Sequence, residues 1–179
     1  QKSGFDPSLI HKEIAIRKTY PWLPSPRILG TANDQTWFNE EWINGTPVNR
    51  LASTGEAKAA VQTALQSLYK LYGHTVTMRN VGKYAEELLS KLEPGAQILA
   101  RFDARFAQDV WELAQLLGRF VSGSNDIQIP VVETHGDFQP ANIFKDGSRV
   151  WLIDWEYSGK RQAAYDGLVY ALHSRFPEG

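Results

Sequence analysis

The chain has 179 residues, 42% of them hydrophobic, and this length suits one domain with a buried core. Its 19 basic and 20 acidic residues nearly cancel to a net charge of −1, which excludes the basic surface of a nucleic-acid-binding protein and a long acidic tail. No cysteine is present, which excludes a disulfide framework, a thiolate metal site and a cysteine nucleophile.

No apolar run approaches the roughly 18 residues that a membrane span requires, and the first residues lack the pattern of a signal peptide. We therefore expect a soluble cytoplasmic protein. We expect neither a membrane nor a nucleic acid among its partners, and the sequence predicts no particular oligomeric state.

The first predicted element is a helix from Pro7 to about Tyr20. Asp6 is a typical N-cap residue, and proline is favoured at the first helical position because its missing N–H would have no helical acceptor there. Glu13 falls in line with the apolar stripe of this helix. A carboxylate at such a position requires a cation, because an unpaired buried charge is costly. The alternative is an ordinary surface glutamate.

Residues 27–30 and 36–43 are two apolar runs around a polar turn, and they predict a β-hairpin. From Leu51 to about Val121 the composition is helical, with three apolar stripes that we interpret as core faces of a helical lobe. The stripes are Val61, Leu65, Leu68 and Tyr72; Val81, Tyr84, Leu88 and Leu92, ended by Pro94-Gly95; and Phe106, Val110, Leu113, Leu117 and Val121.

After a linker at 122–126, residues 128–133 predict a short strand. Residues 143–144 and 149–153 predict a second hairpin, and the Asp146-Gly147 pair between them is typical of a type I′ turn. This hairpin would hold two polar residues at its ends on one rigid element.

Three oxygen-bearing side chains stand at the ends of these apolar runs: Asp137, Asn142 and Asp154. A phosphoryl transfer requires a carboxylate that deprotonates the attacking hydroxyl, and hard oxygen ligands for the Mg²⁺ on the nucleotide phosphates. The spacing D-x-x-x-x-N, followed by an aspartate after a strand, matches the catalytic loop and metal-binding aspartate of protein kinases. We predict that Asp137 is the catalytic base, that Asn142 and Asp154 bind Mg²⁺, and that ATP is the donor.

The sequences of two motifs resemble those of a particular superfamily. Thr134-His-Gly-Asp-Phe-Gln-Pro-Ala-Asn-Ile-Phe144 and Ile153-Asp-Trp-Glu-Tyr-Ser-Gly159, with Tyr165-Asp166 further on, resemble the aminoglycoside phosphotransferases and the choline/ethanolamine kinases. The second motif is most similar to the choline kinase branch. The resemblance implies an α+β, protein-kinase-like fold and an ATP- and Mg²⁺-dependent kinase for the hydroxyl of a small molecule. A choline/ethanolamine-like and an aminoglycoside-like acceptor both stay open.

The resemblance also implies a division of the chain into lobes. Residues 1–43 would form part of the N-terminal lobe with the hinge strand, and residues 44–179 the helical C-terminal lobe. No glycine-rich phosphate loop occurs, so we expect the chain to correspond to the middle part of such a kinase. A catalytically inactive, kinase-like nucleotide-binding module is the alternative function. Metal-assisted hydrolysis at His135 and the two aspartates is a third and weaker hypothesis, which no metal-ligand spacing supports.

Four nucleotide-binding residues follow from the resemblance. Glu13 would pair with Lys2, which would contact the nucleotide phosphates. The stretch Glu40–Thr46 resembles the hinge, where the backbone near Trp42 and Ile43 would bind the adenine. The alternative for this stretch is an ordinary strand and a turn in which Gly45 permits a positive φ.

Four further residues are implied to support the site or to face the acceptor. His135 would brace the catalytic loop, and Glu156 would assist the metal or touch the acceptor. Tyr157 belongs to a group of aromatic residues, with Trp155 and Tyr165, that could bind a quaternary ammonium by cation–π attraction. Asp166 would have a structural role in the lobe. Gln139 stands where many relatives have histidine.

Overall fold

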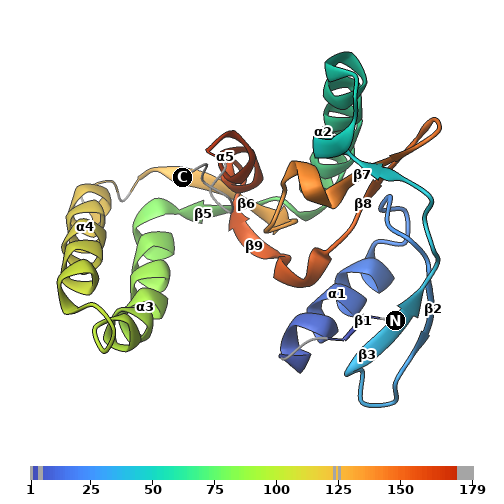
Figure 1. Cartoon of the computed structure of the whole chain (residues 1–179). Helices are drawn as coiled ribbons and strands as arrows, with labels where there is room; N and C mark the ends of the chain where they lie inside the picture. The colour runs from blue at the N-terminus through green and yellow to red at the C-terminus, as the bar shows by residue number, and fades with distance from the viewer. Residues whose placement is uncertain (1, 4–5, 123, 125, 173–179) are drawn as a thin grey trace. The chain divides into compact units, whose positions relative to one another are not determined.

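The structure is a computed structural model that describes residues 2–3, 6–122, 124 and 126–172. Parts of the predicted linker (residues 123 and 125) and the last seven residues of the predicted C-terminal lobe lie outside this description. The α-helices are α1 (Pro7–Thr19), α2 (Thr54–Thr75), α3 (Val81–Leu99), α4 (Ala104–Ser122) and α5 (Tyr165–Ala171) (Figure 1). The 3₁₀ turns are η1 (Val48–Arg50), η2 (Pro140–Asn142) and η3 (Trp155–Tyr157). The strands are β1 (Lys2–Ser3), β2 (Ile28–Thr31), β3 (Trp37–Glu40), β4 (Thr46–Pro47), β5 (Thr77–Asn80), β6 (Gln128–Thr134), β7 (Ile143–Asp146), β8 (Arg149–Leu152) and β9 (Gly159–Gln162).

The chain forms two compact units, Gln1–Val76 with Val132–Gly179, and Thr77–Val131. The first contains the three-stranded sheets β1-β3-β2 and β4-β7-β8, and the second contains α3, α4 and the antiparallel pairing of β5 with the start of β6. The lobe boundary is predicted between residues 43 and 44, and both of these residues lie in the first unit. This boundary stays a prediction. None of the helices in the described residues has the length and apolar composition that crossing a membrane requires.

Helix α1 forms where its capping residues predict it. The Asp6 carboxylate accepts a hydrogen bond of 2.8 Å from the Ser8 N–H, which satisfies one of the free donors of the first turn. Ile10 and Ile14 pack against Phe38 of β3 in a small core of their own. This packing fixes α1 against the sheet β1-β3-β2, so the position of Glu13 on the same helix is fixed as well.

The first predicted hairpin is present as β2 and β3, but β3 ends at Glu40 rather than at Ile43. Residues 41–45 have no regular secondary structure, and the Glu41 N–H donates to the Arg27 carbonyl oxygen at 2.9 Å. The alternative turn at Gly45 is not supported, because the φ angle of Gly45 is not positive. The apolar residues of this segment therefore line a cavity instead of continuing the strand.

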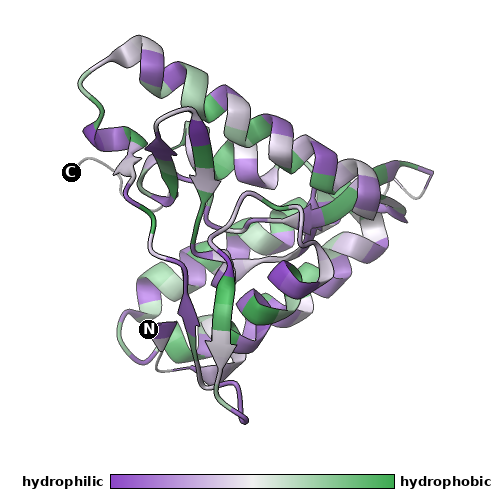
Figure 2. Ribbon diagram, turned by 90° about the vertical axis from the view of Figure 1, so that its right-hand side faces the viewer, coloured by the Kyte–Doolittle hydropathy of each residue, from purple (hydrophilic) through white to green (hydrophobic). Residues whose placement is uncertain are grey.

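The main core lies between α2 and the hairpin β7–β8. The predicted stripe of α2 faces inward, with Leu68 fully buried, and packs in one cluster with Ile143 and Leu152 of the hairpin. Figure 2 shows the alternation of hydrophobic and hydrophilic residues along the helices that such one-sided burial requires. Because α2 supports both strands of the hairpin, it also supports the residues at the hairpin's ends.

The interpretation of the other two stripes as core faces is wrong. Leu88 is 47% exposed, Phe106 is 55% exposed and Leu117 is 57% exposed. The helices α3 and α4 instead meet through small residues: Ala107 is buried, and a Cβ on Gly118 would lie 2.7 Å from Leu89 Cδ1. Small side chains allow the two backbones to approach closely, so the large apolar residues are left on the outside.

The predicted helix end at Pro94-Gly95 is also wrong, since α3 continues through both residues to Leu99. Proline removes one helical hydrogen bond and disturbs the preceding turn, but an exposed helix can continue past this defect.

The second hairpin is confirmed, but its turn is one residue later than predicted. Asp146 pairs with Arg149, so the two loop residues are Gly147 and Ser148. Gly147 has a φ of +55°, whereas Ser148 does not have a positive φ. A type I′ turn requires a positive φ at both positions, so the predicted turn type is wrong.

Candidate active site

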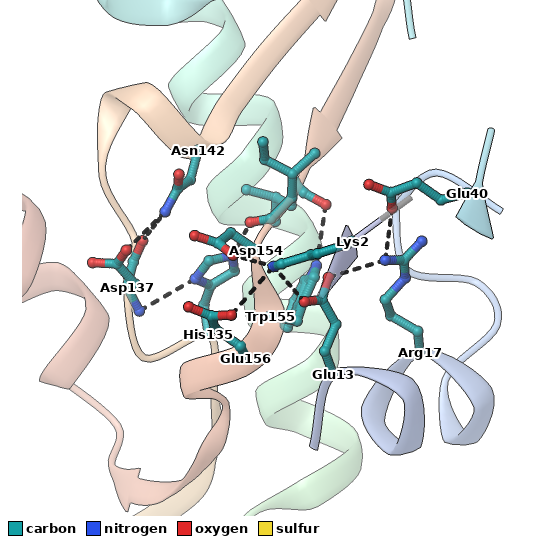
Figure 3. Close-up of polar contacts among 12 residues, drawn as sticks. Lys2, Glu13, Arg17, Glu40, His135, Asp137, Asn142, Asp154, Trp155 and Glu156 are labelled. Carbon is teal, nitrogen blue, oxygen red and sulfur yellow. Dashed lines mark hydrogen bonds and ion pairs between the residues drawn. The ribbon is translucent and has the colours of Figure 1, made fainter. Parts of the chain in front are cut away.

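The loop between β6 and β7 holds the first cluster of polar side chains, and the 3₁₀ turn η2 folds Asn142 back toward Asp137. The Asn142 amide nitrogen donates to the Asp137 backbone oxygen and to its Oδ2, both at 2.9 Å. Gln139 Nε2 donates to the same Oδ2 at 2.8 Å. Asp137 and Asn142 are both buried. The predicted base is therefore oriented by two amide groups of its own loop. Figure 3 shows the contact with Asn142.

His135 links this loop to Ile153, the residue after β8. Its Nδ1 accepts from the Asp137 N–H at 3.3 Å, and its Nε2 contacts the Ile153 carbonyl oxygen at 2.9 Å. These contacts fit a neutral ring that carries its proton on Nε2. Burial lowers the pKa of His135 and outweighs the opposing field of Asp166. A fully buried neutral imidazole that links two segments has the geometry of a bracing residue.

Asp166 is a second residue that holds this loop. It is fully buried, and its carboxylate accepts from the backbone N–H groups of His135 at 2.8 Å and Gly136 at 2.9 Å. The Tyr72 hydroxyl of α2 donates to it at 2.7 Å. Asp166 therefore supports the loop from inside the protein, and nothing in its contacts suits an acceptor-side role. Tyr157 is half-buried and presents its backbone oxygen to Gly136.

Lys2 forms the centre of the second cluster. Its Nζ lies 2.6 Å from Glu13 Oε2 and 3.5 Å from Glu156 Oε2, and it hydrogen-bonds Asp154 Oδ1 (Figure 3). Burial disfavours the charged ammonium, but the field of Glu13 and the hydrogen bonds to Asp154 and Glu13 raise the pKa of Lys2. The predicted contact between Lys2 and Glu13 is thus present, and their role in nucleotide binding stays a prediction.

The carboxylates around Lys2 are close enough to share a cation. One oxygen each from Glu13, Asp154 and Glu156 lies within 4.8 Å of the others. Burial raises the pKa of Glu156, an effect that Lys2 opposes and Asp154 reinforces. Asp154 itself has a left-handed backbone, with φ 68° and ψ 56°, two residues after the end of β8. This conformation is unusual for a residue other than glycine and is found more often at functional sites than elsewhere.

The two clusters are connected through the ends of the hairpin β7–β8. The Ile153 N–H donates to the Asn142 carbonyl oxygen at 3.1 Å, so Asn142 lies beside the residue that precedes Asp154. The His135 ring reaches the Ile153 carbonyl oxygen from the other side. Asp137 is thus hydrogen-bonded to Asn142, and Asn142 is hydrogen-bonded to Ile153, the chain neighbour of Asp154.

A cavity of about 610 Å³ adjoins this junction. Trp42 and Ile43 line one part of it, and Ala141, Phe144 and Ile153 line another. The volume lies within the range of roughly 300–1,000 Å³ that is typical of small-molecule sites. Trp42 is 89% exposed although it is large and apolar, which suits a side chain that a bound molecule would cover.

Comparison with known proteins identifies the family. The model of a phosphotransferase enzyme family matches residues 10–179. The chain belongs to this family. None of the curated proteins matches it.

Solved structures of kinases share the fold of this phosphotransferase family member. A choline/ethanolamine kinase family protein from Mesorhizobium loti has 18% identity and a TM-score of 0.54, over 95% of this chain and 56% of that one. A glucosamine kinase has 15% identity and a TM-score of 0.50, over 99% of this chain and 53% of its own. The complex of glucosamine kinase with glucosamine, ADP and inorganic phosphate has 16% identity and a TM-score of 0.50, over 94% and 50% of the two chains. The phosphotransferase chain spans about half the length of these proteins, and the predicted kinase-like α+β fold is confirmed.

Sequence reasoning did not predict several contacts of this candidate site. Arg17 contacts Glu13 and Glu40, Gln139 holds Asp137, and Tyr72 holds Asp166. Arg17 had a local signal, because it follows Glu13 by four residues on a helix and such pairs face each other. Gln139 stands in the motif near Asp137, but the sequence leaves its role open.

Proposed function

We propose that the protein is a phosphotransferase that transfers the γ-phosphate of ATP to a hydroxyl group of a small molecule. One observation carries the proposal: the oriented carboxylate of Asp137 and the Lys2–Asp154 ion pair are joined through Asn142 and Ile153 beside a cavity of suitable size. Membership of the phosphotransferase family supports the same reaction class.

In this proposal the cavity holds the nucleotide. The adenine lies beside Trp42 and Ile43, whose backbone groups are not engaged in a strand. The ammonium of Lys2 binds the phosphates, and Glu13 holds the ammonium in position.

The donor set at the junction also fits Mg²⁺. The Asn142 side chain binds Asp137 through its nitrogen and not through its oxygen, and the Asp154 carboxylate already binds the Lys2 ammonium. Amide and carboxylate oxygens are the ligands that this metal prefers. Asn142 and Asp154 would hold the metal, with Glu156 nearby. When bound, it would neutralise charge on the nucleotide phosphates.

The transfer itself depends on Asp137. The acceptor oxygen forms a bond to the γ-phosphorus while the bond from that phosphorus to the bridging oxygen of ADP breaks. The hydroxyl proton passes to the Asp137 carboxylate, which Gln139 and Asn142 keep oriented for this step.

The acceptor is a small hydroxyl compound, choline/ethanolamine-like or aminoglycoside-like. Trp155 does not offer a cation–π face for a quaternary ammonium, because it is fully buried and packs against His135 with ring centroids 4.5 Å apart. Glu156 and the half-buried Tyr157 remain as candidate acceptor contacts.

Substitution of the base tests the reaction. ATP-dependent phosphorylation is measured with a panel of choline, ethanolamine, glucosamine and aminoglycosides. In Asp137→Asn, turnover of the active acceptor should fall by about 10²–10⁴, the usual contribution of a general base, while ATP affinity changes little.

The matched control is Asp109→Asn, an exposed aspartate of α4, which should keep full turnover. Unchanged turnover in Asp137→Asn would reject the assignment of the base. ATP binding without transfer to any acceptor would favour the alternative of an inactive nucleotide-binding module.

A further inference from the structure

Arg17 is a buried cation that none of the proposed chemical steps uses. It lies one turn after Glu13 on α1, and its side chain is only 4% exposed. A guanidinium at such a position must have partners for its charge and its N–H groups, because burying them unpaired is costly. The positions of those partners indicate what the residue does.

The first partner is Glu13, and this carboxylate is shared between two cations. Glu13 Oε1 accepts from Arg17 Nη1 at 3.0 Å, while Oε2 accepts from Lys2 Nζ at 2.6 Å. The arginine thereby fixes the rotation of the carboxylate that holds Lys2. Glu13 is only 1% exposed, so water does not replace a lost partner easily.

The other partners belong to the cavity. Arg17 Nη1 donates to Glu40 Oε2 at 2.9 Å, and Nη2 donates to the Pro26 carbonyl oxygen. Both Pro26 and Glu40 line the cavity, and Glu40 is the last residue of β3 before the irregular segment with Trp42. The Phe38 ring lies under the guanidinium, 5.2 Å from Cζ to the ring centroid, and closes its remaining side (Figure 3 shows the arginine with both glutamates).

We propose that Arg17 is a positioning residue for the nucleotide site. Arg17 contacts both Glu13, the carboxylate that binds Lys2, and Glu40, in the cavity wall that would receive the adenine. It therefore keeps a fixed separation between the part of the site that would bind the phosphates and the part that would bind the adenine. This inference rests on the proposed function. Lysine is not an equivalent substitute, because a single ammonium does not offer the planar fork that reaches two carboxylates and a carbonyl oxygen.

The test measures ADP binding by calorimetry, together with thermal unfolding, for Arg17→Lys, Glu40→Gln and the control Lys18→Met, an exposed neighbour on α1. Arg17→Lys keeps the positive charge, and Glu40→Gln keeps a hydrogen-bond acceptor, so both variants should fold. We expect Arg17→Lys to weaken ADP binding by about 10-fold or more, by analogy with the loss of affinity when a partner that orients a metal ligand is changed. Glu40→Gln should weaken binding less, and Lys18→Met not at all.

Measuring Arg17→Lys in a protein that also carries Lys2→Met separates a positioning role from general support of the fold. If Arg17 acts through Glu13 and Lys2, Arg17→Lys should weaken ADP binding less in Lys2→Met protein than in the wild type, because the two substitutions then act on one network. Additive effects on binding would overturn the inference, as would unchanged ADP affinity in Arg17→Lys. If the wild-type protein itself binds no ADP, the proposed function fails together with it.

Discussion

At the scale of single residues, Gly136 sets the shape of the loop that carries the predicted base. Its φ is +86°, and a Cβ there would lie 2.0 Å from the Tyr157 carbonyl oxygen, which belongs to the rigid backbone. The segment that follows Asp154 therefore packs directly against the backbone next to Asp137. A side chain at Gly136 would force the two segments apart.

We predict that Gly136→Ala lowers the free energy of unfolding by about 3 kcal/mol or more, because a backbone clash adds to the strain of a positive φ. Chemical denaturation measures the loss. Gly147→Ala is the matched control: φ is +55° there, but a Cβ would meet nothing within 4 Å. It should cost only about 1–2 kcal/mol, the strain of the left-handed conformation alone. Equal losses in the two variants would contradict the role of the close contact.

His135 should make stability depend on pH. Burial lowers its pKa in the folded protein from the ordinary 6.5, so the unfolded chain binds this proton first as the pH falls. The stability linked to His135 is therefore complete above pH 6.5 and is lost as the pH falls from there toward the lower folded-state pKa, by at most about 1.4 kcal/mol per pH unit.

Unfolding free energies measured from pH 8 to pH 5 check this expectation. His135→Gln should be less stable at pH 8 but should show a flatter slope below pH 6.5, because one titrating group is gone. A slope that is equally steep in His135→Gln would exclude a buried neutral imidazole.

At the scale of elements, α3 contains a defect within an otherwise regular helix. Pro94 is exposed and lies inside Val81–Leu99, where it removes the hydrogen bond to the carbonyl oxygen of Ser90. The helix persists because the surrounding turns and the packing against α4 hold it.

We predict that Pro94→Ala stabilises the second unit by about 1–3 kcal/mol, since alanine restores the missing donor and is the best helix former. The protection of α3 amides from hydrogen exchange should rise, and this measurement reports on the helix itself. Glu93→Ala, at the neighbouring exposed position, should change protection little. A loss of protection in Pro94→Ala would show that the proline is required where it stands.

At the scale of the whole molecule, the candidate site is assembled from the two separate stretches of chain that form the first unit. Lys2 and Asp154 are 152 positions apart in sequence and form a direct hydrogen bond. Helix α1 packs against η3, and α2 packs against the hairpin β7–β8, so the early and late parts of the chain meet around the cavity. The second unit, by contrast, contributes none of the described residues of the candidate site.

The sequence by itself determined the start of α1, the presence of the two hairpins and the short-range part of the site. Asp6 and Pro7 predicted the start of α1, and the spacing of Asp137 and Asn142 predicted a pair that the loop does bring together. These predictions succeeded because capping, turn formation and contacts within one loop depend on neighbouring residues. The two motifs also identified the family, because each is a continuous stretch that can be recognised from neighbouring residues alone.

Only the tertiary structure decided which distant residues meet and which apolar faces are covered. Arg17 reaches Glu40 and Pro26 because the path of the chain brings β2 and β3 over α1, and no periodicity reports that path. Leu117 is exposed although its helix is strongly amphipathic. A hydrophobic stripe shows that a face favours burial, but whether it is buried depends on what the rest of the fold places against it.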